Sequence, residues 1–421
     1  MKYTSYRIAQ DPTLEFRQYP LEREFPVEEY ALRISRARSL MPEAGIDALV
    51  VTSSAVGQWF TGTMEPHSWH DKASSRCTWY VLTADRDYLY ITPTNNHNFA
   101  TSRRMTWVSE VREIVERTAW PRVEIWDLSQ IPEIFSELGL ETSRLGFELG
   151  DTMTLGINTN DFLALKQLMP NAALVDASPM IRHLMAVQTP LEIERVRLAC
   201  RAGQWIHEQV PEVLRAGLTE RQLFAGLAEA FHTRFGAGYS YSPEGGWDVR
   251  NQSHNDYNTY HGVTTDRPYR AGDCVCRGTS GASYRGYGGD IDRVWYLGNP
   301  PEAVLTSYRK AWECNQAMAA AIKPGARCSD VYQAGVVVEK KFGGPIGQSG
   351  RRGHGVRNTA GLSVHPDNHI VLEPGMIISV EPMFGNEYGF FDLEDQYLLK
   401  ETGAECLCDP APERLPCIPT S

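Results

Sequence analysis

A chain of 421 residues, 42% of them hydrophobic, is long enough to form two domains that each bury a core. Acidic residues outnumber basic ones by 52 to 41 and no basic block stands out, which argues against nucleic acid and anionic membranes as partners. No apolar stretch has the length of a membrane-spanning helix, and the N-terminus lacks the apolar core of a signal peptide. We therefore expect a cytoplasmic protein.

The first part of the chain alternates segments of helical and strand-like character. Residues 28–45 are amphipathic at helical spacing, and residues 46–53 follow as a buried strand. Residues 78–93 predict a hairpin with Asp85, Arg86 and Asp87 in its turn. A short helix over 129–140 and strands at 144–150 and 172–178 complete the set. This order predicts an α/β domain over residues 1–180.

The second part opens with a helix over residues 188–210. Thr189 is a good N-cap, Pro190 occupies the first helical position, and Glu192 completes a capping box. The domain boundary therefore lies within residues 175–188. From there the chain carries antiparallel strands backed by helices, which predicts an α+β domain over residues 181–421.

The nine cysteines are scattered, with no C-x-x-C pair among them. Cys274 and Cys276 are spaced C-x-C, as are Cys406 and Cys408, and in a strand this spacing places both thiols on one face. We expect reduced, buried thiols of a cytosolic protein rather than disulfides or metal ligands.

Several acids and one histidine lie in strand-like, apolar surroundings. Alternation places Asp290 and Asp292 on the same face of one strand, while His354, Glu381 and Glu394 come later in the chain. Inward-facing carboxylates repel one another unless a cation lies between them. Oxygen ligands with one imidazole suit Fe, Mn, Co or Zn. The alternative is a set of unrelated acids at strand ends on the surface.

Five phrases of the second part resemble the pita-bread superfamily of methionine aminopeptidase, Xaa-Pro aminopeptidase, prolidase and creatinase. The phrases are HGVTTDRPYRAGD, GASYRGYGGDIDRVWYLG, KPGARCSD, VLEPGMIISVEP and LEDQYLLKETGAE, in the family's order. The resemblance covers about residues 30–410, and KPGARCSD and VLEPGM are closest to creatinase. It implies a creatinase-like N-terminal α/β domain followed by a pita-bread catalytic domain of the α+β class.

The resemblance also implies a metal site that is only partly retained. The metallopeptidases hold two metal ions with five ligands, of which Asp290, His354, Glu381 and Glu394 match four. Thr279 stands where the first aspartate belongs, and that aspartate serves only one of the two metal positions. We therefore expect one divalent metal ion. A site without metal is the alternative, because creatinase itself has lost its metal.

Two further histidines match functional positions of the family. His261 corresponds to the acid/base histidine of creatinase, and His365 to the second histidine of the peptidase phrase. By the same resemblance Glu381 would be the base toward water, and Asp292 stands where creatinase has a substrate-binding carboxylate. Pro366 replaces the glutamate that follows the second histidine in peptidases, which puts ordinary Xaa-Pro cleavage in doubt.

The predicted substrate site combines an arginine with aromatic residues. Arg76 resembles the creatinase arginine that binds the substrate carboxylate of the neighbouring subunit, which implies a homodimer. The tyrosine-rich stretch that contains Trp247 and Tyr260 could enclose a small organic cation. Plain packing is the alternative role for these rings.

These features together favour an enzyme acting on a small molecule. We expect cleavage of a C–N or C–S bond in a carboxylate-bearing zwitterion, of the kind of creatine, ectoine or dimethylsulfoniopropionate. A hydrolase would use water activated by the metal, whereas a lyase would remove a proton next to the carboxylate. The alternatives are an Xaa-Pro dipeptidase or aminopeptidase, and a non-catalytic binding protein on the same fold.

Overall fold

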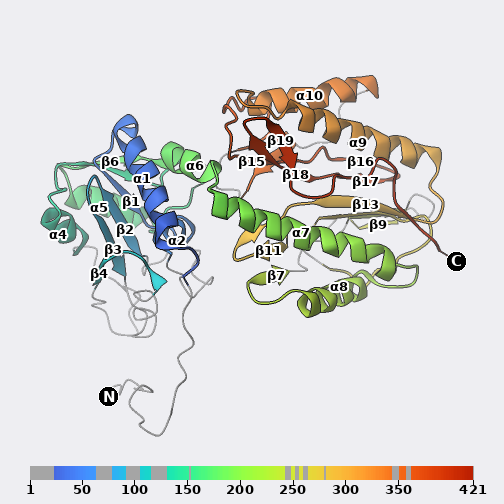
Figure 1. Ribbon diagram of the computed structural model, residues 1–421, viewed down its shortest axis with the longest axis horizontal. Coiled ribbons are helices and arrows are strands. Elements are labelled where there is room, and N and C mark those ends of the chain that lie inside the picture. The colour runs from blue at the N-terminus through green and yellow to red at the C-terminus, as the bar shows by residue number, and fades with distance from the viewer. Residues whose placement is uncertain are drawn as a thin grey trace, which may run out of the picture.

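The computed structural model shows two domains, and a long helix of the second domain begins where the two meet (Figure 1). It describes residues 23–62, 78–91, 105–114, 130–150, 153–241, 248–251, 256–258, 264–278, 281–343, 350–356 and 362–420. None of the helices in these ranges is long and apolar enough to cross a membrane.

The first domain is a six-stranded sheet with helices on both faces. The sheet has the order β4-β3-β2-β1-β5-β6, with β1 antiparallel to β2 and parallel to β5. Its strands are β1 (Ala48–Val51), β2 (Trp79–Thr83), β3 (Asp87–Ile91), β4 (Glu110–Glu113), β5 (Arg144–Phe147) and β6 (Ala173–Asp176). Its helices are α1 (Val27–Ala44), α2 (Ser54–Thr61), α4 (Gln130–Glu137), α5 (Thr159–Leu168) and α6 (Ser178–Ala186).

Strand β1 shows why both faces of this sheet are covered. Leu49 and Val51 pack in one buried cluster with side chains of α1, α2 and α6. Ala48 and Val50 pack in the opposite cluster with side chains of α4 and α5. Alternate residues of a strand point to opposite faces, so a strand that is apolar throughout requires two layers of helices.

The helices, hairpin and strands predicted for this domain are present, and the hairpin turn precedes Asp87, which begins β3. Helix α6 was not predicted. Its residues Ile181 and Leu184 are fully buried in the first domain's core, so α6 belongs to that domain. The division drawn at residues 180 and 181 lies inside α6, and the chain enters the second domain after Ala186, within the predicted interval of residues 175–188.

The long helix α7 (Pro190–Val213) begins with the predicted capping box of Thr189 and Glu192. Glu192 is 2% exposed and also accepts hydrogen bonds from Trp59 of α2, at 2.7 Å, and from Tyr287, at 2.8 Å. Arg33 of α1 lies 3.2 Å from the same carboxylate. One buried glutamate thus joins the start of α7 to both domains.

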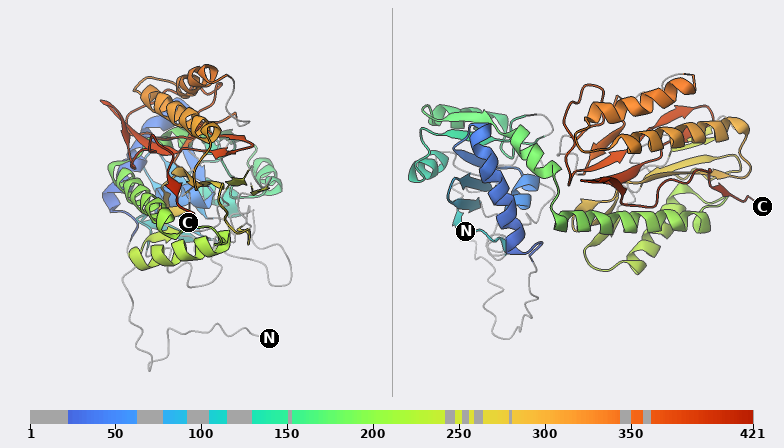
Figure 2. Two further views of the ribbon diagram at one scale, coloured as in Figure 1. Left: turned by 90° about the vertical axis from the view of Figure 1, so that its right-hand side faces the viewer. Right: turned by 45° about the horizontal axis from the view of Figure 1, so that its top comes forward.

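The second domain places sheets between two pairs of helices (Figures 1 and 2). Helices α7 and α8 (Glu220–Arg234) lie on one side, and α9 (Glu302–Ala321) and α10 (Cys328–Lys341) lie on the other. The two larger sheets have the orders β20-β13-β10-β8-β9 and β14-β15-β18-β19. Neighbouring strands within them are antiparallel except β13 and β20. The expected α/β domain followed by an α+β pita-bread domain is confirmed.

The strands of the second domain are short. They are β7 (Tyr239–Tyr241), β8 (Asp248–Asn251), β9 (Asp256–Asn258), β10 (Cys274–Gly278), β11 (Ala282–Tyr284), β12 (Tyr287–Gly288), β13 (Asp292–Leu297), β14 (Gly353–Gly355), β15 (Ile377–Val380), β16 (Phe384–Asn386), β17 (Gly389–Phe391), β18 (Asp395–Lys400), β19 (Gly403–Cys406) and β20 (Cys417–Ile418).

Candidate metal centre

Strand pairing brings the predicted ligands of the second domain together. His354 is the central residue of β14 and lies opposite Ser379 of β15. Glu381 directly follows β15, and Glu394 directly precedes β18. The backbones of Asp292 and Glu394 exchange two hydrogen bonds of 3.2 Å, which ties the start of β13 to the start of β18. The two larger sheets therefore meet where these side chains emerge.

Three of the four predicted ligands form a tight group. The Nε2 atom of His354 lies 3.2 Å from Oδ2 of Asp290 and 3.6 Å from Oε1 of Glu394. Ligand atoms bound at 2.0–2.2 Å around one tetrahedral ion would be about 3.4 Å apart. Asp290 precedes β13 rather than sharing a strand with Asp292, as was predicted, but its side chain still reaches this group.

The chemistry of the group fits a divalent ion. Nδ1 of His354 donates to the carbonyl oxygen of Gly355 at 2.8 Å, which directs Nε2 toward the acids. Glu394 is 2% exposed, and its Oε1 accepts no hydrogen bond from the residues that the structure describes. A buried carboxylate oxygen without a donor is costly, and a bound cation would remove that cost.

The acids hold protons more tightly because they face one another. Burial raises the pKa of Glu394 well above its usual value, and the charges of Asp290 and Glu381 add to the effect. For His354, burial alone would lower the pKa, but the hydrogen bond and negative charge of Asp290 outweigh it and raise the pKa. Both shifts are those of a site that attracts positive charge.

Glu381, the fourth predicted ligand, faces an arginine. Its Oε1 lies 2.9 Å from a guanidinium nitrogen of Arg351, whose side chain is 43% exposed. Burial raises the pKa of Glu381, and the charges of His354 and Arg351 oppose that rise. Arg351 was not predicted as a site residue. Its position three residues before His354, just ahead of β14, is the one signal that could have found it.

A second unpredicted residue, Asp392, lies beside Asp292. Burial first, and then the charges of Asp290 and Glu381, raise the pKa of Asp292 to about 7. Burial and the charges of Asp292 and Glu381 raise the pKa of Asp392 well above its usual value, and the hydrogen bond that protonated Asp392 donates to Asp292 adds to the rise. The spacing of Asp392 and Glu394 repeats that of Asp290 and Asp292, and this repeat was the available signal.

His365 is not a member of this group of three, and it lies beside Gly350, the residue before Arg351. Within the described residues its neighbours are Asp367, 3.7 Å from Nδ1, and the ring of Tyr332, 6.4 Å away between centroids. A Cβ atom on Gly350 would come within 3.0 Å of its Nε2. His365 therefore lies along the segment that carries Arg351, and its predicted catalytic role stays a prediction.

The remaining predicted site residues lie outside the described residues. They are Arg76, Trp247, Tyr260 and His261, together with Thr279 at the position of the missing aspartate. Their predicted roles stay predictions.

Two family profiles cover most of the chain. Residues 33–187 match the creatinase/prolidase N-terminal domain, and residues 194–401 match metallopeptidase family M24.

Curated relatives match at similar levels. The creatinase of Bacillus sp. is 26% identical over 85% of this chain and 84% of its own. The probable dipeptidase PepE of Mycobacterium tuberculosis is 27% identical over 95% of this chain and 99% of its own. The ectoine hydrolase of Halomonas elongata is 25% identical over 91% of this chain and 96% of its own.

The solved structure of dipeptidase PepE from Mycobacterium ulcerans shares the fold. It superposes with a TM-score of 0.76 at 23% identity, over 94% of this chain and 99% of that one. With both domain profiles in the order that the structure shows, the chain belongs to the pita-bread superfamily of creatinases, prolidases and M24 metallopeptidases.

Proposed function

We propose that the protein is a metal-dependent enzyme that cleaves a C–N or C–S bond in a small zwitterion, with hydrolysis of a C–N bond the favoured reaction. The observation that carries this proposal is the charge arrangement around His354. Five carboxyl groups gather there, while one arginine, Arg351, lies against the acid that would serve as base. The five are Asp290, Asp292, Glu381, Asp392 and Glu394.

The position of Arg351 supports the proposal that the substrate carries a carboxylate. Its guanidinium lies 2.9 Å from Glu381 and its side chain is 43% exposed, so a soluble ligand can reach it. A guanidinium offers a planar pair of donors that matches a carboxylate. Arg351, which lies beside Glu381, would place an anionic group of the substrate next to the proposed base.

The site has more carboxyl groups than one divalent ion can neutralise, which supports the proposal that the same substrate also carries a cationic group. One divalent ion offsets two negative charges, and Asp292 and Asp392 lie beyond the group of three that fits such an ion. Arg277 approaches Asp292 closely enough to oppose the rise in its pKa, but its Nη2 atom donates to Tyr241. An ammonium, amidinium or guanidinium group of the substrate would find favourable charge beside Asp292.

The chain's own groups can carry out the proton transfers of a hydrolysis. A divalent ion held by Asp290, His354 and Glu394 would supply Lewis-acid activation. Glu381, whose pKa is raised by burial, is suited to accept a proton from water and deliver it to the leaving nitrogen. Arg351 would orient the substrate carboxylate, and the resemblance adds His261 and His365 as proton shuttles.

Cleavage of Xaa-Pro dipeptides is the second candidate. It is favoured by the likeness to dipeptidase PepE, which is as high as the likeness to creatinase. It is disfavoured by Pro366, which replaces the acid that follows the second histidine in the peptidase phrase. A non-catalytic binding protein is the third candidate, and the retained acids and histidine around the metal centre disfavour it.

A substrate panel separates the three candidates. The full chain, loaded separately with Mn²⁺, Co²⁺, Zn²⁺ and Fe²⁺, would be assayed on creatine, ectoine, dimethylsulfoniopropionate and related guanidino and amidino acids, beside Xaa-Pro dipeptides. We expect turnover of a zwitterion and weak or no dipeptide cleavage. Dipeptide cleavage at the higher rate would support the peptidase. Binding of a zwitterion by calorimetry with no turnover under any metal would support the binding protein.

A further inference from the structure

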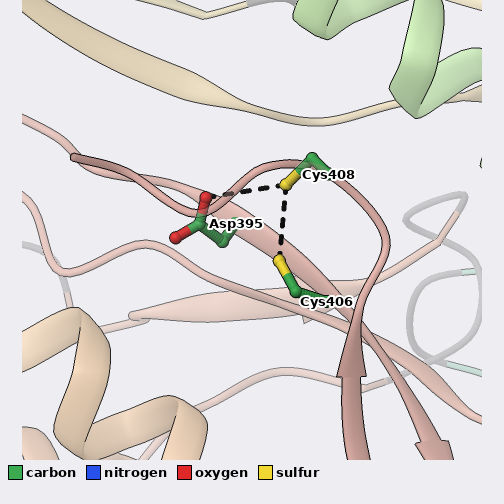
Figure 3. A group of neighbouring side chains, drawn as sticks. All are labelled: Asp395, Cys406 and Cys408. Carbon is green, nitrogen blue, oxygen red and sulfur yellow. Dashed lines mark hydrogen bonds between the residues drawn. The ribbon is translucent and has the colours of Figure 1, made fainter.

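A pair of thiols lies at the end of β19, beside Asp395 (Figure 3). The sulfur atoms of Cys406 and Cys408 are 3.6 Å apart, and the Sγ atom of Cys408 is also 3.6 Å from Oδ1 of Asp395. Cys406 ends β19, the edge strand of its sheet, and the backbone bends at Leu407 and Cys408. The bend brings the two thiols together.

The other C-x-C pair of the chain provides a contrast. Cys274 and Cys276 lie in the straight strand β10 and are both buried in one core cluster. Cys406 and Cys408 are only half-buried and lie at a sheet edge. The expectation of buried thiols therefore holds for the first pair and is wrong for the second.

The hydrogen bond between the two thiols of the second pair distinguishes their pKa values, while Asp395 and Arg293 act on both in the same direction. Asp395 is fully buried, and its Oδ1 accepts a 2.8 Å hydrogen bond from Arg293. The hydrogen bond from Cys408 lowers the pKa of Cys406, against the effect of burial, and the same bond raises the pKa of Cys408 well above its usual value. Cys406 is thus the better nucleophile, and Cys408 is the resolving thiol, which reacts second.

We infer that Cys406 and Cys408 form a reversible dithiol–disulfide site that reacts with small-molecule disulfides. The thiolate of Cys406 attacks one sulfur of the disulfide and releases one thiol. Cys408 then loses its proton, attacks the sulfur of Cys406 in the mixed disulfide and releases the second thiol. The protein dithiol is oxidised by two electrons, and the small disulfide is reduced to two thiols.

The geometry favours this reaction over a soft-metal site. The sulfurs must approach from 3.6 Å to a bond of about 2.0 Å, which a side-chain rotation at a bend can supply. A metal ion would need Asp395 as its third ligand. That carboxylate already accepts from Arg293 at 2.8 Å and from the backbone of Ala411 at 3.2 Å, and the guanidinium beside it repels a cation.

Trypsin isolates the pair for a direct test. Cleavage after Lys400 and Arg414 releases peptide 401–414, whose only cysteines are Cys406 and Cys408. The exposed Cys417 lies in peptide 415–421 and provides an internal comparison. The folded, full-length protein would be reduced, treated with oxidised glutathione, alkylated, digested and analysed by mass spectrometry.

We expect peptide 401–414 of the wild type to lose the mass of two hydrogen atoms and to resist alkylation until it is reduced again. Cys408→Ser should instead retain glutathione on Cys406, because the resolving thiol is absent. Cys406→Ser should lose the reaction, and Cys417→Ser should behave as the wild type does. Circular dichroism would show that each variant folds.

Three outcomes would overturn the inference. One is full alkylation of both thiols in peptide 401–414 while Cys417 becomes glutathionylated. Another is a glutathione adduct on the wild-type peptide that never resolves. The third is a metal ion that Cys406→Ser and Cys408→Ser each release while Glu394→Gln retains it, which would identify a thiolate metal site instead.

Discussion

Five carboxyl groups in one interior region cannot all remain ionised without positive charge among them. Among the described residues around His354, the cations are the imidazole itself, Arg351, which pairs with Glu381, and Arg277, which lies near Asp292. Burial first, and then the neighbouring acids, raise the pKa values of Glu394 and Asp392, which favours their protonated forms when no metal ion is bound. Metal binding must therefore release protons, and its affinity must increase with pH.

Replacing a single ligand should separate metal binding from folding. We expect about one divalent ion per chain, because the retained ligands build one site. Glu394→Gln should lower metal affinity by more than the roughly 10–100-fold cost of an outer-shell change, and activity should fall with it. Elemental analysis after gentle purification measures the occupancy. Glu387→Gln, an exposed glutamate of the same region, is the matched control. Two tightly held ions per wild-type chain would contradict the prediction.

The stability of the metal-free protein should depend on pH through Asp292. Burial raises its pKa to about 7, against about 3.9 in the unfolded chain. A raised folded-state pKa contributes stability that is complete below about pH 4 and is lost as the pH rises through about 7. Asp292→Asn, which cannot ionise, should flatten the fall of the melting temperature across this range. His207 has a lowered pKa, caused by burial, and acts in the opposite direction in both proteins.

The two proteins differ in one ionisable side chain, so the difference between their curves reports Asp292 together with Asp392 and Glu394, whose pKa values the charge of Asp292 raises. Chelator must be present throughout, since bound metal would hold the acids ionised. Parallel melting curves for wild type and Asp292→Asn between pH 4 and 7 would show that Asp292 does not carry the raised pKa.

Arg351 should matter for substrate binding more than for folding. With the zwitterion that the panel identifies, Arg351→Ala should raise KM by about 10–150-fold, the equivalent of roughly 1.5–3 kcal/mol for a charge-assisted contact. Arg351→Lys should have an intermediate effect, because lysine keeps the charge but loses the planar pair of donors. Steady-state kinetics measures both, and Arg414→Ala, at an exposed arginine, is the control. An unchanged KM would remove Arg351 from substrate recognition.

At the scale of elements, local chemistry decided which predictions succeeded. The start of α7 was predictable because Thr189, Pro190 and Glu192 form a complete capping signal. Helix α5 was missed although Asn158 caps it by accepting a hydrogen bond from the backbone of Asp161. Helix α6 was missed because its first residues, Ser178 and Pro179, follow a strand and resemble a linker. Its burial depends on α1, which is distant in sequence.

The site residues divide in the same way, into those that a local sequence signal predicts and those that depend on contacts between distant parts of the chain. Glu381 and Glu394 could be predicted because an acid at the end of an apolar strand is conspicuous in the sequence. The pairing of Arg351 with Glu381 could not be predicted, because it depends on β14 lying beside β15. Asp292 and Asp392 are 100 residues apart, and they meet through tertiary contacts such as the backbone bridge between Asp292 and Glu394.

Glu192 should be a major determinant of stability where α7 meets both domains. Glu192→Ala removes the acceptor of Trp59 and Tyr287 and leaves Arg33 with less compensating charge in a buried position. We expect the free energy of unfolding to fall by about 3–5 kcal/mol, the usual cost of breaking a buried charge network. Urea unfolding measures the change.

Glu194→Ala is the matched control for that helix. Glu194 lies two positions further along α7, is 56% exposed and pairs with Arg201 at 3.2 Å. Its replacement should change the free energy of unfolding by no more than about 0.5 kcal/mol. Equal effects of the two substitutions would mean that Glu192 contributes through helix capping alone.

For the whole molecule, the arrangement of the domains raises the question of whether one chain makes a complete active site. The metal centre lies entirely within the second domain, on strands β13, β14, β15 and β18 and the residues beside them. The sequence resemblance to creatinase assigns Arg76 of the first domain to a substrate carboxylate of the neighbouring subunit. We propose on that basis that the active unit is a homodimer in which Arg76 acts across the interface.

Mixing two inactive variants tests this proposal directly. Arg76→Ala and Glu381→Ala should each be inactive alone, because one lacks a substrate contact and the other lacks the base. A heterodimer would contain one complete site, with Arg76 from one chain and Glu381 from the other. Random mixing makes half of the dimers heterodimers with one working site of two, so about a quarter of wild-type activity should return. Sedimentation confirms that dimers form again. If co-folded mixtures dimerise normally and stay inactive, Arg76 does not act in the partner's site.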